Sequence, residues 1–461
     1  MNDVAVRFVT RADRELRNDR VRAAVRHTTG LLAANRSTAL DGLADPDAVR
    51  DSAHAIRRRA IDTLPQLLDR WAARATANGI IVHRARTAAD AVRVVLDLAD
   101  AQATAGHSPV RIAKGKSMAS EEIDLNDALE AAGHEVVETD LGEFIIQLAR
   151  EKPSHLIVPA IHKSRFDVAE LFTTDAGRPI EPDVDAEAAY ARARLREAFL
   201  RADIGITGVN FAIAETGSVC LVENEGNGRM CTSLPRVHVA IMGMERIVDT
   251  WAELDVMLAL LARSATGQAL SVYTNIISGP RRDDELDGPD EVHVIVLDNG
   301  REAIVGTEFD DALLCIRCGA CLNVCPVYRN IGGHAYGTVY SGPIGAVLMP
   351  LLRPDDPASR ELSEASTLCG ACTEVCPVRI PLHDLLLRER HRDAPGDASR
   401  LRRVTFRLWS VAWAHPLSYR ISIHAVRAIL RLSSRVPNLA RRAPGWAGAW
   451  TRDRVVPRVR R

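Results

Sequence analysis

The chain has 461 residues, 47% of them hydrophobic, and its 59 Lys and Arg residues nearly balance its 60 Asp and Glu residues. That length suffices for two or three domains with a sizeable core, whereas a net charge of −1 without any known nucleic-acid module argues against nucleic-acid binding. The sequence has no run of about eighteen apolar residues, and its N-terminus has no basic region followed by an apolar stretch, so we expect a cytoplasmic protein without a spanning helix.

Residues 1–78 predict a helical lead-in. One helix is expected over 20–34. A second begins at Asp45 and Pro46, because an acidic N-cap satisfies free backbone N–H groups and proline is tolerated at the first helical position. This second helix should extend to about Ala77 and bury apolar residues spaced three and four apart: Ile61, Leu64, Leu67, Leu68 and Trp71.

Between residues 79 and 300, short apolar runs alternate with helical segments, which is the pattern of an α/β domain. Helices are predicted over 87–101, 185–202 and 253–262. The segment 203–243 should run strand, turn, strand, turn, strand, with 224–229 as a candidate hairpin turn. The other strands predicted for the sheet are 79–83, 110–113, 135–138, 155–159, 272–274 and 292–297.

Polar residues at strand ends and turns of this domain predict a small-molecule pocket. Ligands of open α/β sheets gather at the carboxyl ends of strands. The candidate pocket residues are Lys116, Glu215, Asn224 and Arg229. Lys116 and Arg229 are suited to meet a carboxylate. The alternative is purely structural, with a hairpin turn at 224–229 and Lys116 at the start of a helix.

No nucleotide-binding motif accompanies these residues. Gly115-Lys116-Ser117 resembles the end of a phosphate-binding loop, but Val110 stands where such a loop needs glycine. The nearest approach to G-x-G-x-x-G begins at Gly226 and ends at Cys231. We therefore expect no conventional NAD or FAD site, and no hydride acceptor within this chain.

Two cysteine runs lie between residues 315 and 376. The first, C-x2-C-x2-C-x3-C-P, consists of Cys315, Cys318, Cys321 and Cys325, and the second, C-x2-C-x3-C-P, of Cys369, Cys372 and Cys376. Soft thiolates at these spacings are typical ligands of [4Fe–4S] clusters, and the fourth cysteine of such a run commonly binds the other cluster of a pair. The sequence therefore predicts a ferredoxin-type two-cluster domain at 301–392, mainly α-helical.

If the last cysteine of each run binds the cluster of the other run, each of the seven thiols can be assigned to one of the two clusters. One cluster is expected on Cys315, Cys318, Cys321 and Cys376, and the other on Cys325, Cys369 and Cys372. The second run lacks its first cysteine, whose place falls on Ser366. Either the fourth ligand of this second cluster is the Ser366 oxygen, water, another cysteine or substrate, or the second cluster is [3Fe–4S]. The sequence leaves these alternatives open.

Structural zinc is the main alternative for these cysteines, because it also uses paired C-x2-C motifs. Zinc needs four ligands, however, and seven are present, with proline directly after the last cysteine of both runs. A disulfide framework is disfavoured in a long chain without a secretory signal. Cys220 and Cys231 lie outside the runs and are expected to be buried apolar residues.

Residues 393–461 predict a basic helical tail. From residue 401 to 461 there are fourteen arginines, no lysine and a single acid, Asp453, which gives a charge of +13. Amphipathic helices are expected near 407–417 and 421–432. Tryptophans accompany the arginines at Trp409, Trp413, Trp446 and Trp450. Such a tail suits peripheral contact with an anionic membrane surface or a partner subunit; the alternative is a helical extension that packs on the same chain.

Four segments resemble the lactate-utilisation (LUD) domain: KSMASEE at 116–122, GITGVNFAIAETG at 205–217, NEGNGR at 224–229 and LPRVH at 234–238. With the cysteine runs and the basic tail, the whole chain is similar to the lactate utilisation protein B family, iron–sulfur subunits of bacterial L-lactate oxidation. The resemblance implies an α/β fold of the sugar-phosphate isomerase and CoA-transferase type. It also implies two [4Fe–4S] clusters on the ligand sets above, and companion subunits that together convert L-lactate to pyruvate.

Two functions from different classes follow from these observations. The first is an electron-transfer subunit, in which two clusters divide the two electrons released by lactate. The chain would then be one subunit of an oxidoreductase, with its redox partner not identified by the sequence. The second is a ligand-binding or catalytic α/β module whose clusters serve as a redox sensor or a structural element.

Overall fold

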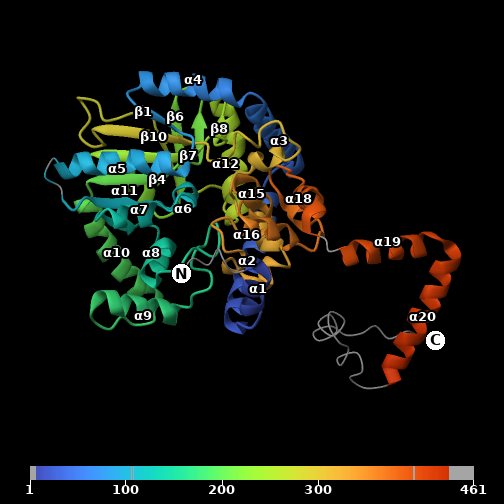
Figure 1. Ribbon diagram of the computed structural model, residues 1–461. Helices are drawn as coiled ribbons and strands as arrows, with labels where there is room; N and C mark the ends of the chain where they lie inside the picture. The colour runs from blue at the N-terminus through green and yellow to red at the C-terminus, as the bar shows by residue number, and fades with distance from the viewer. Residues whose placement is uncertain (1–6, 105, 107, 398–399, 436–461) are drawn as a thin grey trace. The chain divides into compact units, whose positions relative to one another are not determined.

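The computed structural model describes residues 7–104, 106, 108–397 and 400–435. Residues up to Arg390 form one unit, which contains the sheets and both cysteine runs (Figure 1). The described residues from His391 onward belong to a second unit.

Four helices precede the main sheet: α1 (Phe8–Leu16), α2 (Asp19–Asp41), α3 (Pro46–Asp62) and α4 (Leu64–Ala77). The Asp45 carboxylate caps α3 by accepting the Ala48 N–H at 3.0 Å. The predicted single helix over 45–77 is broken at Thr63, with φ −115°, because Pro65 in the first turn of α4 has no N–H to continue the helical bonding. All five residues of the predicted apolar stripe are buried.

Six parallel strands form the main sheet, in the order β1 (Ile81–Ala85), β10 (Glu291–Leu297), β7 (Val237–Gly243), β4 (Ile204–Gly208), β2 (Arg111–Lys114) and β3 (Glu135–Glu138). All residues of the central strand β7 are buried, as expected for a parallel sheet covered on both faces. After β2 the chain forms β3 on one side and then places β4 on the other. The strand order therefore reverses between β2 and β4, where open α/β sheets accept ligands.

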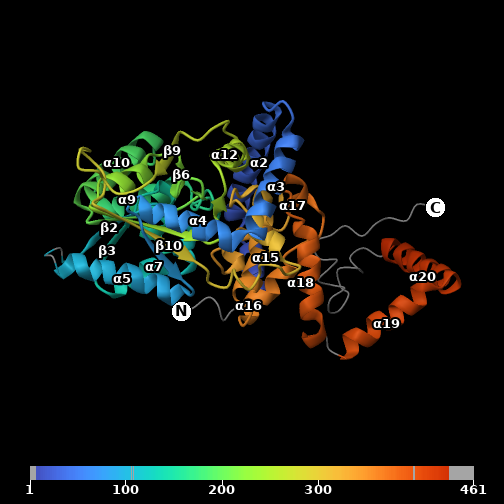
Figure 2. The ribbon, with the colours of Figure 1, turned by 90° about the horizontal axis from the view of Figure 1, so that it is seen from above.

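Helices cover both faces of this sheet. Helices α5 (Ala88–Thr104) and α7 (Leu125–Ala131) lie on one face, and α9 (Arg165–Ala176) and α10 (Val184–Arg201) lie on the other (Figure 2). Val95 and Leu129 pack with Ile112 in the first of these cores, and Phe172 and Phe199 belong to the second, with α8 (Leu141–Ala149). The predicted α/β domain is confirmed, and its main sheet is parallel.

A second sheet departs from the prediction of a single one. Its four strands are β8 (Ile247–Val248), β5 (Phe211–Ile213), β6 (Ser218–Glu223) and β9 (Tyr273–Ile277), with β6 antiparallel to both β5 and β9. Phe211 and Val219 share a core with Met242 of β7 and with Met257 of α12 (Trp251–Ala265). The strand predicted at 272–274 therefore belongs to this smaller sheet.

Two local predictions are wrong. No strand forms at 155–159, because the Nδ1 atom of His155 accepts the backbone N–H groups of Ile157 and Val158, which a sheet would otherwise use. The hairpin turn predicted at 224–229 does not form, because the helix α11 (Asn227–Ser233) begins within that range. The Glu223 carboxylate accepts the N–H groups at the start of this helix, from Gly228 at 2.6 Å and Arg229 at 2.7 Å.

The region after the sheets is helical, and its described residues from 298 to 397 contain no strand. Helix α2 packs against two of its short helices, α13 and α14, and α1 packs against η3. The elements in chain order are η2 (Asp310–Leu314), α13 (Ala320–Val324), α14 (Tyr328–Ile331), η3 (His334–Tyr336), α15 (Gly342–Leu352), α16 (Pro357–Arg360), η4 (Glu361–Glu364), α17 (Ala371–Val375) and α18 (Leu382–Asp397).

The second unit contains helices α19 (Arg400–Ala414) and α20 (Pro416–Arg435). The ring centroids of Trp409 and Trp413 lie 5.2 Å apart on α19, and both side chains are exposed. Trp446 and Trp450, which the sequence also placed in the tail, lie outside the described residues. Within the part of the chain that the structure describes, no helix combines the length and apolar character that crossing a membrane requires.

Candidate functional site

The two cysteine runs share one local structure. In each, a cysteine is followed by a left-handed glycine and a five-residue helix that carries the next cysteine and ends at another. The glycine is Gly319 (φ 74°) before α13 in the first run and Gly370 (φ 83°) before α17 in the second. Glycine adopts this conformation at little cost because it has no Cβ. Since α13 packs against α17, the two runs lie side by side.

Ser366 takes in the second run the position that Cys315 takes in the first. The Cys315 Sγ accepts the backbone N–H of Arg317 at 3.4 Å, and the Ser366 Oγ accepts the N–H of Leu368, also two residues further on, at 3.1 Å. Arg317 and Leu368 both have left-handed backbones, with φ of 60° and 54°. The serine oxygen is therefore held in the local geometry of the missing cysteine sulfur.

Four cysteines line one cavity: Cys315, Cys318, Cys321 and Cys376. The other three influence one another electrostatically. Burial, together with the charges of Cys325 and Cys369, raises the pKa of the Cys372 thiol to about 11, although backbone hydrogen bonds act to lower it. Ligation of metal by either group of thiols stays a prediction.

The donor set fits iron–sulfur clusters. Burial, together with the charge of neighbouring thiols, raises the pKa of Cys318 and Cys376 to about 12. Crowded thiolates in an apolar site need a compensating positive charge, which a metal centre supplies. Backbone N–H groups also point at sulfur, from Tyr328 to Cys325 at 3.5 Å and from Ile380 to Cys376 at 3.4 Å. Such bonds to sulfur tune cluster potentials.

A separate cavity of about 340 Å³ lies at the carboxyl ends of β2, β4 and β7. Its lining includes residues that follow or end these strands, at 115–119, 207–210, 241–243, 245 and 246. Helix α6 (Met118–Glu122) begins there, directly after β2. The cavity thus covers the point between β2 and β4 where the strand order reverses. Its volume is in the range of small-molecule sites.

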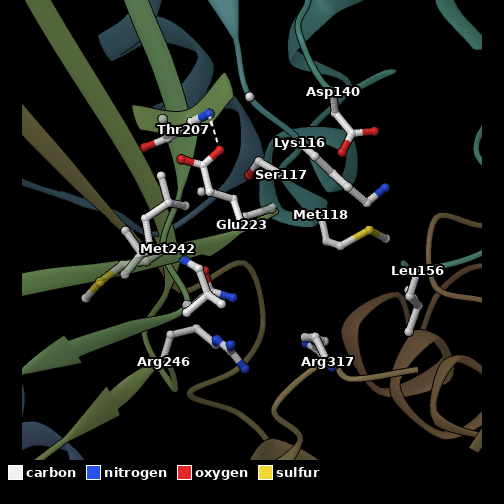
Figure 3. A pocket seen from close by; sticks show the side chains of 18 of the residues that line it. Lys116, Ser117, Met118, Asp140, Leu156, Thr207, Glu223, Met242, Arg246 and Arg317 are labelled. Atoms are coloured by element: carbon white, nitrogen blue, oxygen red, sulfur yellow. Dashed lines mark hydrogen bonds between the residues drawn. The ribbon is translucent and has the colours of Figure 1, made fainter. Parts of the chain in front are cut away.

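The cluster region contributes to the wall of this cavity, through Arg317 and Tyr340. The side chains of Arg246 and Arg317 lie on one side, and those of Lys116 and Asp140 lie on the opposite side (Figure 3). Because Arg317 stands between Cys315 and Cys318 in the chain, the cavity connects the α/β domain with the first cysteine run.

Arg246, Arg301 and Arg317 form one side of the cavity, the arginine wall, and buried ion pairs hold it in place. Arg301 bonds both oxygens of Glu122, at 2.9 Å and 2.6 Å, and its Nε lies 2.8 Å from Glu245. Arg317 Nη2 lies 3.2 Å from Glu245, and its guanidinium stacks over the Tyr340 ring at 4.4 Å. Burial alone would raise the pKa of Glu122, but the charge of Arg301 lowers it to about 2. The two carboxylates are therefore ionised and hold the arginines in place.

The pocket residues predicted from the sequence lie in different places. Lys116 and Asn224 line the cavity, and the Lys116 ammonium pairs with Glu143. Glu215 is not in the lining; its carboxylate accepts the N–H of Trp251 at 2.9 Å. Arg229 is also outside the lining, exposed on α11.

The sequence analysis did not predict that Arg246 and Arg317 form the cationic side of this cavity. Arg317 was visible inside the first cysteine motif, but nothing local indicated that its side chain reaches the sheet. Arg246 donates to the Cys315 carbonyl at 2.9 Å, although the two residues are far apart in the sequence. Only the packing of the β7 end against the cysteine loop brings them together.

Comparisons with known proteins agree with both parts of the structure. The LUD domain model matches residues 68–297, and the 4Fe-4S dicluster domain model matches residues 311–380. The four LUD-like motifs lie within the first match, and all seven cysteines of the two runs lie within the second.

Curated relatives are similar over most of the chain. "Uncharacterized electron transport protein YkgF" of Escherichia coli K12 is 44% identical, over 91% of this chain and 87% of its own. "Lactate utilization protein B" of Macrococcus caseolyticus is 43% identical over 96% and 92%, and that of Oceanobacillus iheyensis 41% over 98% and 94%. A solved DUF162 family protein from Deinococcus radiodurans covers 51% of this chain and 98% of its own at 17% identity, with a TM-score of 0.27.

Proposed function

This chain belongs to the lactate utilization protein B family, and on that premise we propose that it is the iron–sulfur electron-transfer subunit of a bacterial L-lactate oxidation system. The observation that carries the proposal is the packing of α13 against α17, which gathers both cysteine runs into one region. Lactate releases two electrons on oxidation to pyruvate, so a chain that holds two one-electron centres is suited to divide them.

The proposed ligands are those expected from the crossing of the runs: Cys315, Cys318, Cys321 and Cys376 for one [4Fe–4S] cluster, and Cys325, Cys369 and Cys372 for the second. The cavity lined by the first four thiols supports this division. When bound, the clusters supply one-electron transfer. The chain's own residues position the thiols, direct N–H groups at sulfur and exclude water from most of them.

Companion lactate-utilisation subunits complete the proposal, because the motifs of this chain offer no conventional site for a hydride acceptor. We further propose that the α/β domain is related to sugar-phosphate isomerases and CoA-transferases. The second function considered, a ligand-binding α/β module, is favoured by one specific observation, the cavity at the strand ends. Ligand binding in this cavity is compatible with electron transfer in one chain, whereas clusters that serve only as a redox sensor or a structural element are not.

The test is anaerobic purification of the full chain, followed by iron and sulfide analysis and a redox titration monitored by EPR. We expect iron and acid-labile sulfide near the amounts for two clusters, and reversible one-electron signals from both. A colourless protein that contains zinc and no labile sulfide would overturn the proposal.

A further inference from the structure

The arginine wall of the cavity at the strand ends contains a hydrogen-bond donor that no acceptor among the described residues meets. Arg317 Nη1 is buried and has no hydrogen-bond partner among the described residues. Leaving a buried charged donor unpaired is costly, so such a group usually meets a ligand or water. Its other terminal nitrogen, Nη2, is already occupied by Glu245. One guanidinium N–H direction therefore remains for an acceptor from outside the chain.

The charge on this wall also calls for an anion. Three guanidinium groups, those of Arg246, Arg301 and Arg317, face two carboxylates, those of Glu122 and Glu245. Arg301 pairs with both acids, whereas Arg246 donates to the backbone carbonyls of residues 315 and 316. The side chains of the wall thus carry one more positive than negative charge, which the Cys315 thiol offsets when it is ionised.

The opposite wall limits how much negative charge a ligand can bring. Asp140, Glu223 and Glu225 line that side. Their carboxylates accept backbone N–H groups, for example that of Glu143 by Asp140 at 3.1 Å and that of Leu141 by Glu225 at 3.0 Å. The Lys116 ammonium on this side is already paired with Glu143, so the acids held there would repel a second anionic group. A ligand with a single negative charge suits this arrangement.

Polar groups between the two walls are suited to a hydroxyl or carbonyl. Ser117, Thr207 and Asn210 line the cavity at the ends of β2 and β4. Asn210 uses its Oδ1 to accept the Val222 N–H at 2.8 Å, which leaves its amide N–H groups directed elsewhere. Met118, Met242 and Leu156 supply an apolar lining between these groups (Figure 3).

We propose that this cavity binds a small monocarboxylate that carries a neighbouring hydroxyl or keto group, with its carboxylate on Arg317 and its other oxygen toward Ser117, Thr207 and Asn210. This site deepens the proposed function, because it places a substrate-sized anion beside the first cysteine run. A hydrogen bond from a guanidinium to a carboxylate is strong because it is charge-assisted.

The test is isothermal titration calorimetry on the anaerobically prepared full chain with four probes: L-lactate, neutral lactamide, L-malate and inorganic phosphate. L-lactate should bind, and the other three should bind at least about tenfold more weakly. In Arg317→Gln the affinity for L-lactate should fall about 10- to 100-fold, since a hydrogen bond to a charged group is lost. Arg317→Lys should recover part of it.

Two controls separate binding from folding. Arg84→Gln removes an exposed arginine that pairs with Asp69 on the same domain and should leave affinity unchanged. Iron content and circular dichroism of Arg317→Gln should match those of the wild type; if they do not, Arg317→Lys, which keeps the charge, becomes the test variant and should bind L-lactate more weakly than the wild type. Tighter binding of malate or phosphate, no binding of lactate, or equal affinity in the variant and wild type would overturn the proposal.

The outcome is separable from that of the proposed function. A protein with both clusters and reversible electron transfer, but without monocarboxylate binding, contradicts the cavity assignment alone. A protein that binds L-lactate through Arg317 but holds no iron–sulfur cluster contradicts the electron-transfer function alone.

Discussion

Arg50 of α3 donates a hydrogen bond from Nη2 to the backbone carbonyl of Cys376 at 3.0 Å. Two further residues of the N-terminal helices hold the same loop. Arg36 donates to the Val375 carbonyl at 2.7 Å, and His54 Nδ1 contacts the Val378 carbonyl at 3.0 Å. The N-terminal helices therefore form part of the structure that holds the last cysteine of the second run beside the first run.

Replacing Arg50 by alanine should destabilise this loop. The variant loses a charged donor to a partly buried carbonyl, so we expect the free energy of unfolding of the metal-free protein to fall by roughly 1.5–3 kcal/mol. Denaturant unfolding followed by circular dichroism measures the change. Arg59→Ala on the same helix is the matched control, because its exposed pair with Glu253 contributes at most about 1 kcal/mol. Equal effects of the two variants would contradict the role of Arg50.

Cys376→Ala should remove the cluster of the first run, although Cys376 lies in the second. The reason is its place in the cavity with Cys315, Cys318 and Cys321. Cys369→Ala is the matched variant and should spare that cluster and affect the other. EPR spectra and iron content of the anaerobically prepared proteins distinguish the two. If Cys376→Ala and Cys369→Ala lose the same signal, the crossing of ligands is wrong.

Ser366→Cys should complete the second set of thiols. The Ser366 oxygen already has the N–H contact that the Cys315 sulfur has in the first run, so a cysteine there meets the same local geometry. We expect the second cluster to resist iron loss under mild oxidation better than in the wild type, as measured by EPR of the three-iron form. Thr367→Cys, one residue further on, is the control and should give no such protection.

The fold was predictable where local pattern and tertiary structure agree. The strand at Glu135–Glu138 has the predicted bounds because it pairs with β2, and the Gln147 side chain bonds its other edge without displacing that pairing. The segment 155–159 has the same apolar character but a histidine whose ring accepts two backbone N–H groups. That side-chain contact overrides strand propensity, and it cannot be predicted from propensity alone.

The two candidate sites also differ in how far the sequence could predict them. The cysteine spacing is local and carries the chemistry of the ligands, so both runs could be recognised from sequence. The cavity is assembled from residues of several strand ends and of the cysteine loop, and Arg246 reaches Cys315 only through packing across the chain. The sequence offered Arg229 as the carboxylate partner because it follows a Gly-rich turn; the helix that forms there exposes it instead.

Acid should destabilise the α/β domain through His238. This side chain is fully buried and its Nε2 lies 2.9 Å from the Thr207 hydroxyl. Burial, with a smaller effect of His293, lowers its pKa from 6.5 to about 4. Between these values the unfolded chain binds a proton that the folded chain does not, so stability is complete above pH 6.5 and is lost as the pH falls toward 4. The loss from this residue approaches about 3 kcal/mol.

The measurement is the free energy of unfolding as a function of pH for wild type and His238→Gln. Glutamine keeps a polar partner for Thr207 but does not titrate. Between pH 6.5 and 4, the slope of its unfolding free energy against pH should therefore be smaller, by an amount that corresponds to about one bound proton. The exposed His27→Gln on α2 is the matched control. A slope for His238→Gln that equals that of the control would show that His238 does not titrate between the two states.

The second unit should bind anionic membranes. Its described helices carry arginines and no acidic residue from 400 to 435, and α19 exposes Phe406, Trp409 and Trp413, at 59%, 52% and 38% of their surfaces. Aromatic rings with basic residues favour the interface of an anionic bilayer, where each Lys or Arg contributes about 1 kcal/mol. We expect the full chain to sediment with phosphatidylglycerol vesicles and not with phosphatidylcholine vesicles, with binding that weakens as salt rises.

Tryptophan variants locate the contact. Trp409→Ala and Trp413→Ala should each weaken vesicle binding several-fold, because each ring removed takes apolar area from the interface. Trp251→Ala is the matched control, since Trp251 is also exposed but lies in the first unit, on α12. If binding to phosphatidylglycerol is absent, insensitive to salt or equally reduced by Trp251→Ala, the tail does not act as a membrane contact. A companion subunit, or the rest of this chain, is then the surface that its charge and aromatic residues fit.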